Sequence, residues 1–209
     1  MDNQLLKKRE EVAYFMRRLY EQKLTTTSGG NVSLRVDDKV LITPSQTDKG
    51  RIKDEEIAIF NIDGKNLTPH LKSSMETGMH LSIYKKRRDV KAIVHAHPVF
   101  ATSFAISKKE IKTNLSGEAR AIIGVPVKAP YALMGTKELA DIVAEASLKG
   151  NVILMENHGV LTAGETLLQA YDRLEVLEAA AKITFITEML GERKELSEER
   201  LKEIDDLFS

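Results

Sequence analysis

The chain of 209 residues contains no cysteine, so it can form no disulfide, no cysteine-ligated metal site and no thiolate nucleophile. It also lacks any run of about 18 apolar residues, and we therefore expect no transmembrane helix and no membrane partner. The first residues are too charged for the apolar core of a secretory signal peptide. We expect a cytoplasmic protein in which only His, Asp or Glu can hold a metal.

An excess of charge of one sign is also missing. The 31 Lys and Arg residues balance 31 Asp and Glu residues, which argues against a broad electropositive surface and a nucleic-acid partner. The composition, with 42% hydrophobic and 30% charged residues, is that of a globular protein and excludes disordered and fibrous classes. A chain of this length can bury one sizeable core. We expect a single domain over 1–209, with a C-terminal helical tail over 192–209.

Hydrophobic periodicity predicts strands and helices mixed along the chain. The strands are short and several are joined by tight turns, so the sheet should be mostly antiparallel. We expect an α/β fold, a three-layer α/β/α sandwich around a mixed sheet. Strands or extended segments are predicted at 31–36, 40–43, 57–62, 90–95, 126–131 and 152–155. Helices are predicted at 2–22, 74–84, 98–106, 136–149 and 166–190, with a short one after Ser197.

Three of the five histidines follow apolar strand patterns. His95 and His97 end the run AIVHAHP, and residues i and i+2 of a strand point to the same side. His158 follows the run VILMEN. Three neutral imidazoles with an open fourth position form the ligand set of a catalytic zinc site, and Co²⁺ or Mn²⁺ would also suit it. The alternative is that each histidine is a strand-end residue satisfied by hydrogen bonds.

Other candidate residues are less specific. Glu76 lies in a predicted helix just before the His-x-His strand, where it could be a catalytic carboxylate or an exposed first-turn glutamate favoured by the helix dipole. His80, one turn later, is more typical of a packing residue than of a metal ligand. Small polar clusters at element boundaries could bind an anion through hydroxyls and backbone amides, or could be simple turns and caps. These clusters comprise 28–31, 43–45 and 73–74.

Six segments together resemble the class II aldolase/adducin family, in the order found there, and most closely its fuculose-phosphate-aldolase-like members. The resemblance runs from the first helix to the end of the long helix near Leu190 and covers nearly the whole chain. It implies an α/β/α fold and a homotetramer with active sites at subunit contacts. The segments are TSGGNVSLR, LITPS, SSMETGMHLSIY, VKAIVHAHP, VPVKAPYALMGTKELA and ILMENHGVLTAG.

The resemblance implies a lyase of carbohydrate metabolism that cleaves a small phosphorylated ketose to dihydroxyacetone phosphate and an aldehyde. Zinc would act as the Lewis acid, and Glu76 would exchange the proton at carbon. No lysine forming a Schiff base is required. By the same resemblance the metal ligands are His95, His97 and His158, and the phosphate site draws on Ser28, Gly30, Asn31, Ser45 and Ser74.

Three departures from the family pattern bear on substrate recognition. Gln46 stands where the family usually has Gly, and its side chain could crowd or replace backbone contacts to phosphate. Met75 stands where a second Ser is usual. The segment 114–118 contains no counterpart of the tyrosine that fuculose-phosphate aldolase contributes as a proton donor, and Tyr131 falls on a different motif.

Related activities remain open at this point. Sugar-phosphate 4-epimerases share the fold and the histidines but generally carry Asp where Glu76 stands, which favours an aldolase. A methylthioribulose-phosphate dehydratase also uses zinc and a carboxylate. A non-enzymatic adducin-like module lacks the complete set of histidines, whereas this chain has all three.

Overall fold

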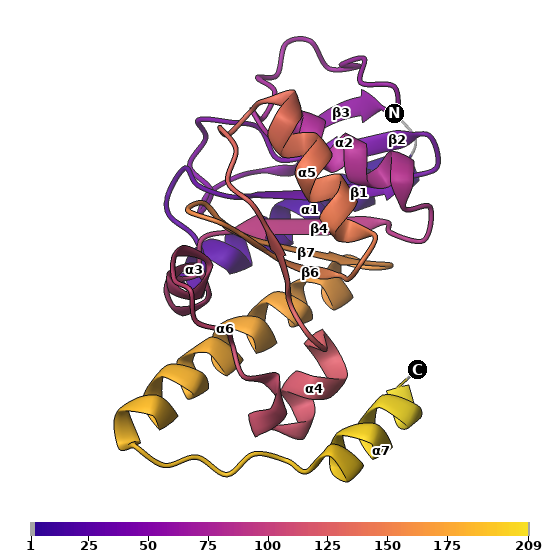
Figure 1. The fold of residues 1–209 in the computed structure, drawn as a ribbon. Helices are drawn as coiled ribbons and strands as arrows, with labels where there is room; N and C mark the ends of the chain where they lie inside the picture. Colours follow the sequence, from indigo (N-terminus) through magenta and orange to yellow (C-terminus); the bar gives the residue numbers. More distant parts are fainter. Residues whose placement is uncertain (1–2, 209) are drawn as a thin grey trace.

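The computed structural model describes residues 3–208 and is built on one seven-stranded sheet with the order β3-β2-β1-β4-β7-β6-β5 (Figure 1). Every neighbouring pair is antiparallel except β5 and β6, which confirms the predicted mixed, mostly antiparallel sheet. The domain was predicted over 1–209, and its Met1, Asp2 and Ser209 lie outside the described residues. Asp2 is also the first residue of the helix predicted at 2–22. The strands are β1 (Asn31–Val36), β2 (Lys39–Ile42), β3 (Ala58–Asn61), β4 (Ala92–Ala96), β5 (Val127–Ala129), β6 (Val152–Met155) and β7 (Gly159–Gly164).

Helices cover both faces of this sheet, as the three-layer prediction requires (Figure 1). Alternate strand residues point to opposite faces, so Val94 packs with the layer formed by α1, α3, α4 and α6, while Ile93 packs with α2 and α5. The sheet is therefore buried on both sides. The helices are α1 (Asn3–Glu21), α2 (Thr77–Lys86), α3 (Val99–Ile106), α4 (Gly117–Ile123), α5 (Lys137–Ser147), α6 (Leu167–Leu190) and α7 (Glu198–Phe208), with 3₁₀ turns η1 (Asp54–Glu56) and η2 (Thr113–Leu115).

Helix α2 begins later than its hydrophobic pattern predicts. The carbonyl of Ser74 accepts hydrogen bonds from the backbone N–H (3.2 Å) and the hydroxyl (2.8 Å) of Thr77, which closes a turn before the helix. Ser74 therefore lies outside α2, and Glu76 is its N-cap residue instead of a first-turn residue. Because α2 begins after Glu76, the Glu76 side chain points toward the sheet rather than along the helix surface.

The sequence pattern missed α4 and β7. Strand β7 has glycine at both ends and Ala163 within it, so only its three central residues, 160–162, have side chains that suit a strand. It forms because β4 and β6 pair with it on both sides. Helix α4 is only seven residues long and begins with Gly117, so it shows no clear helical period, although Ser116 caps it by accepting from the Ala119 N–H.

Helix α6 extends beyond the sheet, as Figure 1 shows. Its N-terminal half buries apolar residues at helical spacing, including Leu174 and Leu177. Phe185 continues this spacing but is 48% exposed, and the sheet does not reach this end of the helix. The last apolar residues, Met189 and Leu190, are also exposed.

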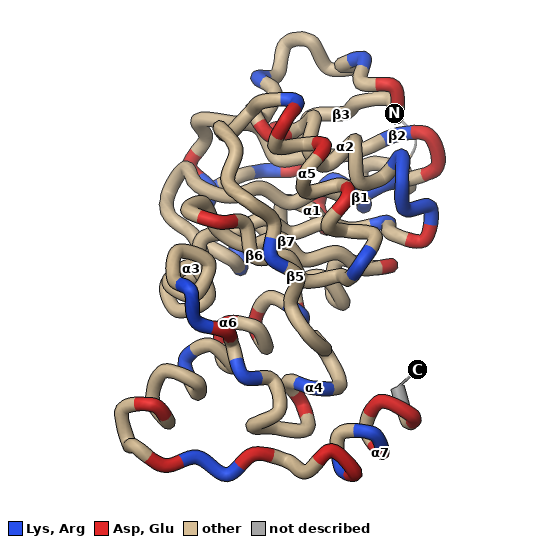
Figure 2. The backbone as a smooth tube through the Cα atoms, in the orientation of Figure 1, with Lys and Arg blue, Asp and Glu red and all other residues tan. Residues whose placement is uncertain are grey.

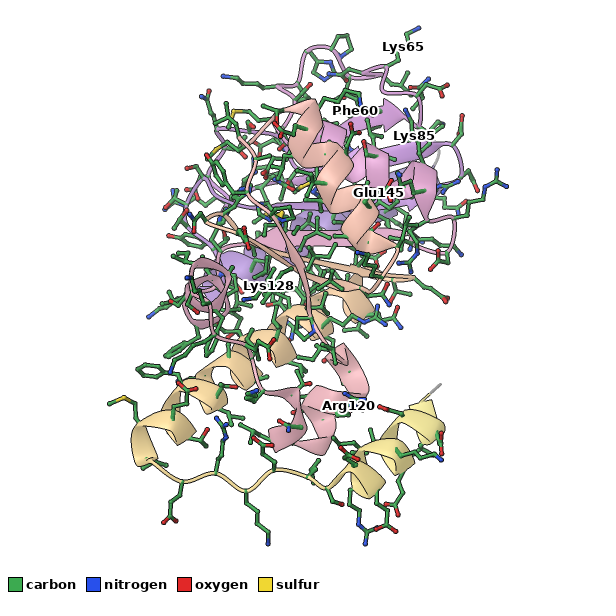
Figure 3. All side chains as sticks on the ribbon, viewed as in Figure 1. Phe60, Lys65, Lys85, Arg120, Lys128 and Glu145 are labelled. Atoms are coloured by element: carbon green, nitrogen blue, oxygen red, sulfur yellow. The ribbon has the colours of Figure 1, made fainter. Side chains whose placement is uncertain are left out.

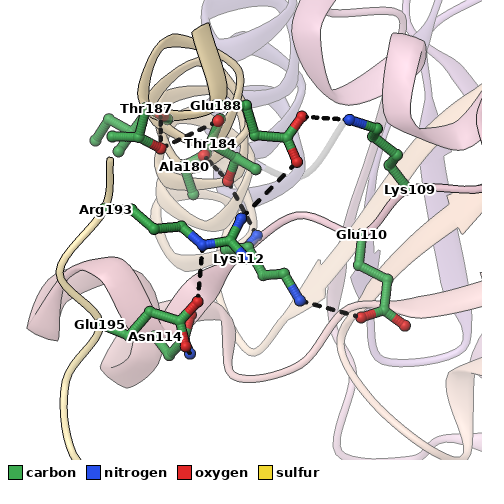
Figure 4. Close-up of polar contacts among 11 residues, drawn as sticks. Lys109, Glu110, Lys112, Asn114, Ala180, Thr184, Thr187, Glu188, Arg193 and Glu195 are labelled. Atoms are coloured by element: carbon green, nitrogen blue, oxygen red, sulfur yellow. Dashed lines mark hydrogen bonds and ion pairs between the residues drawn. The ribbon is translucent and has the colours of Figure 1, made fainter. Parts of the chain in front are cut away.

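The C-terminal segment crosses back from the end of α6 to α4. Asn114 anchors it, since its carbonyl accepts from the Leu196 N–H (2.9 Å) and its side-chain amide donates to Glu195 (2.9 Å; Figure 4). Arg120 on α4 then pairs through two nitrogens with Asp205 on α7 (Figure 3). Acidic and basic residues are interspersed along this segment (Figure 2). The described helices include none that is long and apolar enough to cross a membrane.

Candidate active site

The end of β4 brings two histidines together at the centre of the sheet. His95 pairs across the sheet with Asn31 on β1 and Leu161 on β7, and its side chain is fully buried. The ring of His97 lies 4.7 Å from that of His95, measured between centroids. The backbone of Gly159 must pass close by, since a Cβ there would lie 2.6 Å from the His97 ring. The local packing therefore demands glycine beside the two imidazoles.

The turn between β6 and β7 supplies the third histidine. Asn157 adopts a left-handed backbone with φ of 52°, a conformation that asparagine tolerates better than most residues. The N–H of His158 donates to the Met155 carbonyl (3.2 Å) and closes the turn. The ring centroid of His158 then lies 4.9 Å from that of His95 and 5.6 Å from that of His97.

These three side chains form a group that can hold a metal ion. One ligand atom from each lies within 4.8 Å of the others. The Nδ1 of His95 donates to the Val160 carbonyl at 2.9 Å, which leaves the Nε2 lone pair free to coordinate. That Nε2 is buried and makes no hydrogen bond, although a carboxylate oxygen of Glu76 lies 3.1 Å away. Because an unpartnered buried polar atom is costly, a coordinated cation would satisfy this nitrogen, and the residues fit a divalent metal.

Glu76 faces the histidines from the N-terminus of α2. Its Oε2 lies 3.1 Å from His95 Nε2, and its Oε1 lies 3.1 Å from His158 Nε2. The side-chain amide of Asn31 donates to Oε2 at 2.8 Å and holds the carboxylate in this position. Glu76 is only 8% exposed, so it is not the solvated surface glutamate of the alternative interpretation.

The charges in this cluster favour an ionised Glu76, easier protonation of His95 and a neutral His97. Burial raises the pKa of Glu76, but the charge of His95 and short contacts with His158 and His95 outweigh it, so the pKa lies well below its usual range. Burial lowers the pKa of His95, and the Glu76 carboxylate outweighs that effect and raises it. Burial and the charges of His95 and His158 lower the pKa of His97 to about 3. His97 is therefore neutral at pH 7, the form that binds a metal.

A cavity of about 270 Å³ opens in front of the cluster. Glu76, His97 and His158 line it, whereas His95 lies behind them. All the residues named as phosphate candidates line the same cavity; they are Ser28, Gly30, Asn31, Ser45 and Ser74. The chain thus brings together residues from positions 28 to 158 on one side of the metal-binding group.

Several of these polar groups are already engaged with one another. The Ser45 hydroxyl accepts from the Met75 N–H (3.2 Å), and the Ser74 hydroxyl accepts from the Glu76 N–H (3.3 Å). Gln46 adopts a positive φ of 58°, which explains why glycine suits this position. Its side chain is exposed and bonds Lys72 rather than lining the cavity, so the expected crowding of the phosphate site does not occur.

Three further cavity residues were missed by the sequence analysis. Met134 and Asn157 belong to loops whose course no local pattern reveals. Lys49 lies in the polar loop after β2, and its side chain is 1% exposed. A hydroxyl-rich loop followed by a lone lysine was the available signal.

His80 is not part of the metal-binding group; its Nδ1 lies 2.7 Å from the Ser33 hydroxyl in the core.

Lys49 makes the stability of the protein depend on pH. Burial lowers its pKa from 10.5 to about 8, and the charge of Glu56 opposes this only in part. Between pH 8 and 10 the unfolded chain binds a proton that the folded chain lacks, so the free energy of unfolding rises with pH in this window. Relative to a Lys49→Met variant, we expect a gain of about 1 kcal/mol from pH 8 to pH 9. Urea unfolding of metal-free protein at the two pH values measures it, and equal changes in both proteins would contradict the assignment.

Comparison with known proteins agrees with this architecture. The family model described as "Class II Aldolase and Adducin N-terminal domain" matches residues 10–185. The chain is 33% identical over 207 residues to the 5-deoxy-D-ribulose 1-phosphate aldolase of Bacillus thuringiensis serovar kurstaki, covering 98% of this chain and 96% of the relative. It is 36% identical over 170 residues to the L-fuculose phosphate aldolase of Methanocaldococcus jannaschii, covering 81% and 91%.

A third relative and a solved structure are also similar to this chain. The chain is 33% identical over 185 residues to the 3-oxo-tetronate 4-phosphate decarboxylase of Haemophilus influenzae, covering 86% of this chain and 88% of the relative. A solved structure named L-fuculose 1-phosphate aldolase superimposes with a TM-score of 0.89 at 30% identity, covering 100% of this chain and 97% of that chain. The named relatives are all lyases. The chain therefore belongs to the class II aldolase and adducin family.

Proposed function

We propose that this protein is a zinc-dependent aldolase that reversibly cleaves a phosphorylated ketose to dihydroxyacetone phosphate and a small aldehyde. The observation that carries the proposal is the convergence of three imidazoles and the Glu76 carboxylate at one cavity. The likeness to relatives named as aldolases of ketose phosphates supports the substrate class.

The histidines hold the metal in this proposal. His95, His97 and His158 supply one nitrogen each, and the site would also accept Co²⁺ or Mn²⁺. A bound divalent metal supplies a Lewis acid that draws electron density from the ketose carbonyl. The hydrogen bond from His95 to the Val160 carbonyl fixes the ring so that its Nε2 faces the metal position.

Glu76 moves the proton. In the synthetic direction its ionised carboxylate takes a proton from the hydroxymethyl carbon of dihydroxyacetone phosphate, and that carbon then attacks the aldehyde. In the cleavage direction the Glu76 carboxylate takes the proton of the C4 hydroxyl as the bond between C3 and C4 breaks and the aldehyde forms, while the electron pair remains with C3. Glu76 then delivers this proton to C3, which completes dihydroxyacetone phosphate and restores the carboxylate. The hydrogen bond from Asn31 keeps the carboxylate beside the reacting carbon.

The rest of the cavity binds the two ends of the substrate. We assign the phosphate to the side lined by Ser28, Gly30, Asn31, Ser45 and Ser74. Met75 and Met134 line the cavity as well and are 66% and 53% exposed. Their apolar surface favours an aldehyde that ends in an apolar group.

A second candidate reaction is decarboxylation of a phosphorylated oxo acid, which the likeness to a 3-oxo-tetronate 4-phosphate decarboxylase favours. The same metal and carboxylate could stabilise the carbanion left after loss of CO₂. Product analysis separates the reactions. An aldolase yields dihydroxyacetone phosphate and an aldehyde, a decarboxylase yields CO₂, and an epimerase or dehydratase retains the carbon skeleton.

We further propose that the enzyme is a cytoplasmic homotetramer with its sites at subunit contacts. Exposed apolar side chains on α3 and the end of α6 support the association; they are Val99, Ile106, Phe185, Met189 and Leu190. A charged phosphorylated sugar is confined to the compartment in which it is made, which supports the location. Sedimentation equilibrium measures the mass in solution, and a monomer at micromolar concentration would contradict the assembly.

A further inference from the structure

One charged side chain in the cavity wall has no role in the reaction described above. Among the lining residues in the described part of the chain, Lys49 is the only lysine or arginine. Its loop folds back onto the segment before β1, because the Lys49 N–H donates to the Thr27 carbonyl at 2.9 Å. The side chain is 1% exposed, so the ammonium group lies inside the protein.

Protein groups satisfy this ammonium only in part. Its Nζ donates one hydrogen bond to the Pro44 carbonyl, which leaves two N–H donors. None of the ion pairs formed by residues 3–208 includes Lys49; the charge of Glu56 acts on it from a greater distance. A buried cation without an adjacent anion is unfavourable, so the position is suited to an anion that arrives with the substrate.

The neutral groups around Lys49 can donate hydrogen bonds to a phosphate but carry no charge to balance it. Asn31 donates to Glu76, and the Ser45 and Ser74 hydroxyls accept backbone hydrogen bonds while each keeps an O–H to donate. A phosphate monoester carries about −1.5 to −2 charges at pH 7. Every hydrogen bond to this anion has a charged acceptor, but only an ammonium adds the attraction of an opposite charge, so it would contribute most to binding this group.

We propose that the Lys49 ammonium binds the phosphate of the substrate and selects phosphorylated over free ketoses. This inference rests on the proposed aldolase function for the identity of the substrate. It assigns a charge to a site for which the sequence pattern offered only hydroxyls and backbone amides. Lys49 also holds the 44–49 turn through Pro44, so anion binding and the shape of the loop are coupled.

Inorganic phosphate tests the site without assuming the reaction. Isothermal titration of the zinc-loaded protein should give a dissociation constant that rises about 10- to 100-fold in Lys49→Met and in Lys49→Gln, the second of which keeps a hydrogen-bond donor. Lys53→Met is the matched control, because it removes an equal charge four residues away from a side chain that is 70% exposed. The control should bind phosphate within about twofold of the unmodified protein.

Kinetics separate phosphate binding from a merely structural role. With a ketose 1-phosphate, KM should rise by a similar factor while kcat changes less, and the preference for the phosphorylated over the unphosphorylated ketose, as a ratio of kcat/KM, should fall by that factor. Zinc content should be retained, and the melting temperature should not fall, because each substitution removes a buried charge. Unchanged phosphate affinity in both Lys49 variants, or no phosphate binding by the unmodified protein, would overturn the proposal. Lysine-dependent phosphate binding without cleavage of any ketose phosphate would support Lys49 and refute the aldolase assignment alone.

Discussion

Replacement of Glu76 by glutamine is expected to lower the rate of proton exchange at the hydroxymethyl carbon of dihydroxyacetone phosphate by about 10³-fold, while the metal stays bound. Glutamine has the size of glutamate and can accept the hydrogen bond from Asn31, but it cannot take up a proton at neutral pH. The three histidines remain in place. The chemistry should therefore fail without loss of the fold or of the metal.

Proton exchange into deuterated water, followed by NMR, isolates this step because it needs no aldehyde. Metal content is measured on the same sample. Glu145→Gln is the control, since this glutamate lies on α5 with its side chain 61% exposed (labelled in Figure 3), and it should retain the exchange rate within about twofold. Full exchange in a metal-loaded Glu76→Gln variant would remove Glu76 from the proposed mechanism.

Replacement of His95 by asparagine is expected to abolish stoichiometric metal binding and to lower cleavage by about 10³-fold or more, because the Lewis acid contributes several kcal/mol to the transition state. His95 also donates to the Val160 carbonyl from a fully buried position. Losing this donor should cost about 1–3 kcal/mol of stability in addition. His97→Asn should lose the metal with a smaller stability cost, since this ring lies at the cavity wall.

Metal content after dialysis and the rate of cleavage test this expectation together. His70→Asn provides the control, because His70 is exposed and is not part of the histidine group. Added zinc should restore activity to the unmodified protein after chelation but not to His95→Asn. A His95→Asn protein that keeps one metal per chain and full activity would show that the metal is held elsewhere.

The fold could be predicted where local patterns coincide with tertiary packing. The alternation over Asn31–Val36 and the stripe of α6 are strong signals because the same residues form the core. Strand β7 was missed because a run of only three strand-forming residues, 160–162, is a weak signal, and the strand is completed by pairing with β4 and β6. The exposure of Phe185 could not be predicted, because hydrophobic spacing does not reveal where the sheet ends beneath a helix.

The candidate site, like the fold, could be predicted from the sequence only in part. His95 and His97 share a side of the chain by strand geometry alone, and that proximity could be predicted. The approach of Glu76 could not, because it depends on a turn at Ser74 that delays the start of α2. Lys49 was missed because neither composition nor period distinguishes a buried lysine in a polar loop from an exposed one.

Release of dihydroxyacetone phosphate from a panel of ketose 1-phosphates, with and without a chelator, tests the proposed function most directly. We predict release from at least one sugar of the panel, loss of release with the chelator and recovery when zinc is added. The preferred sugar would then identify the aldehyde that fits beside Met75 and Met134. A protein that holds zinc but releases no dihydroxyacetone phosphate from any ketose 1-phosphate would contradict the assignment and direct attention to decarboxylation, epimerisation or dehydration.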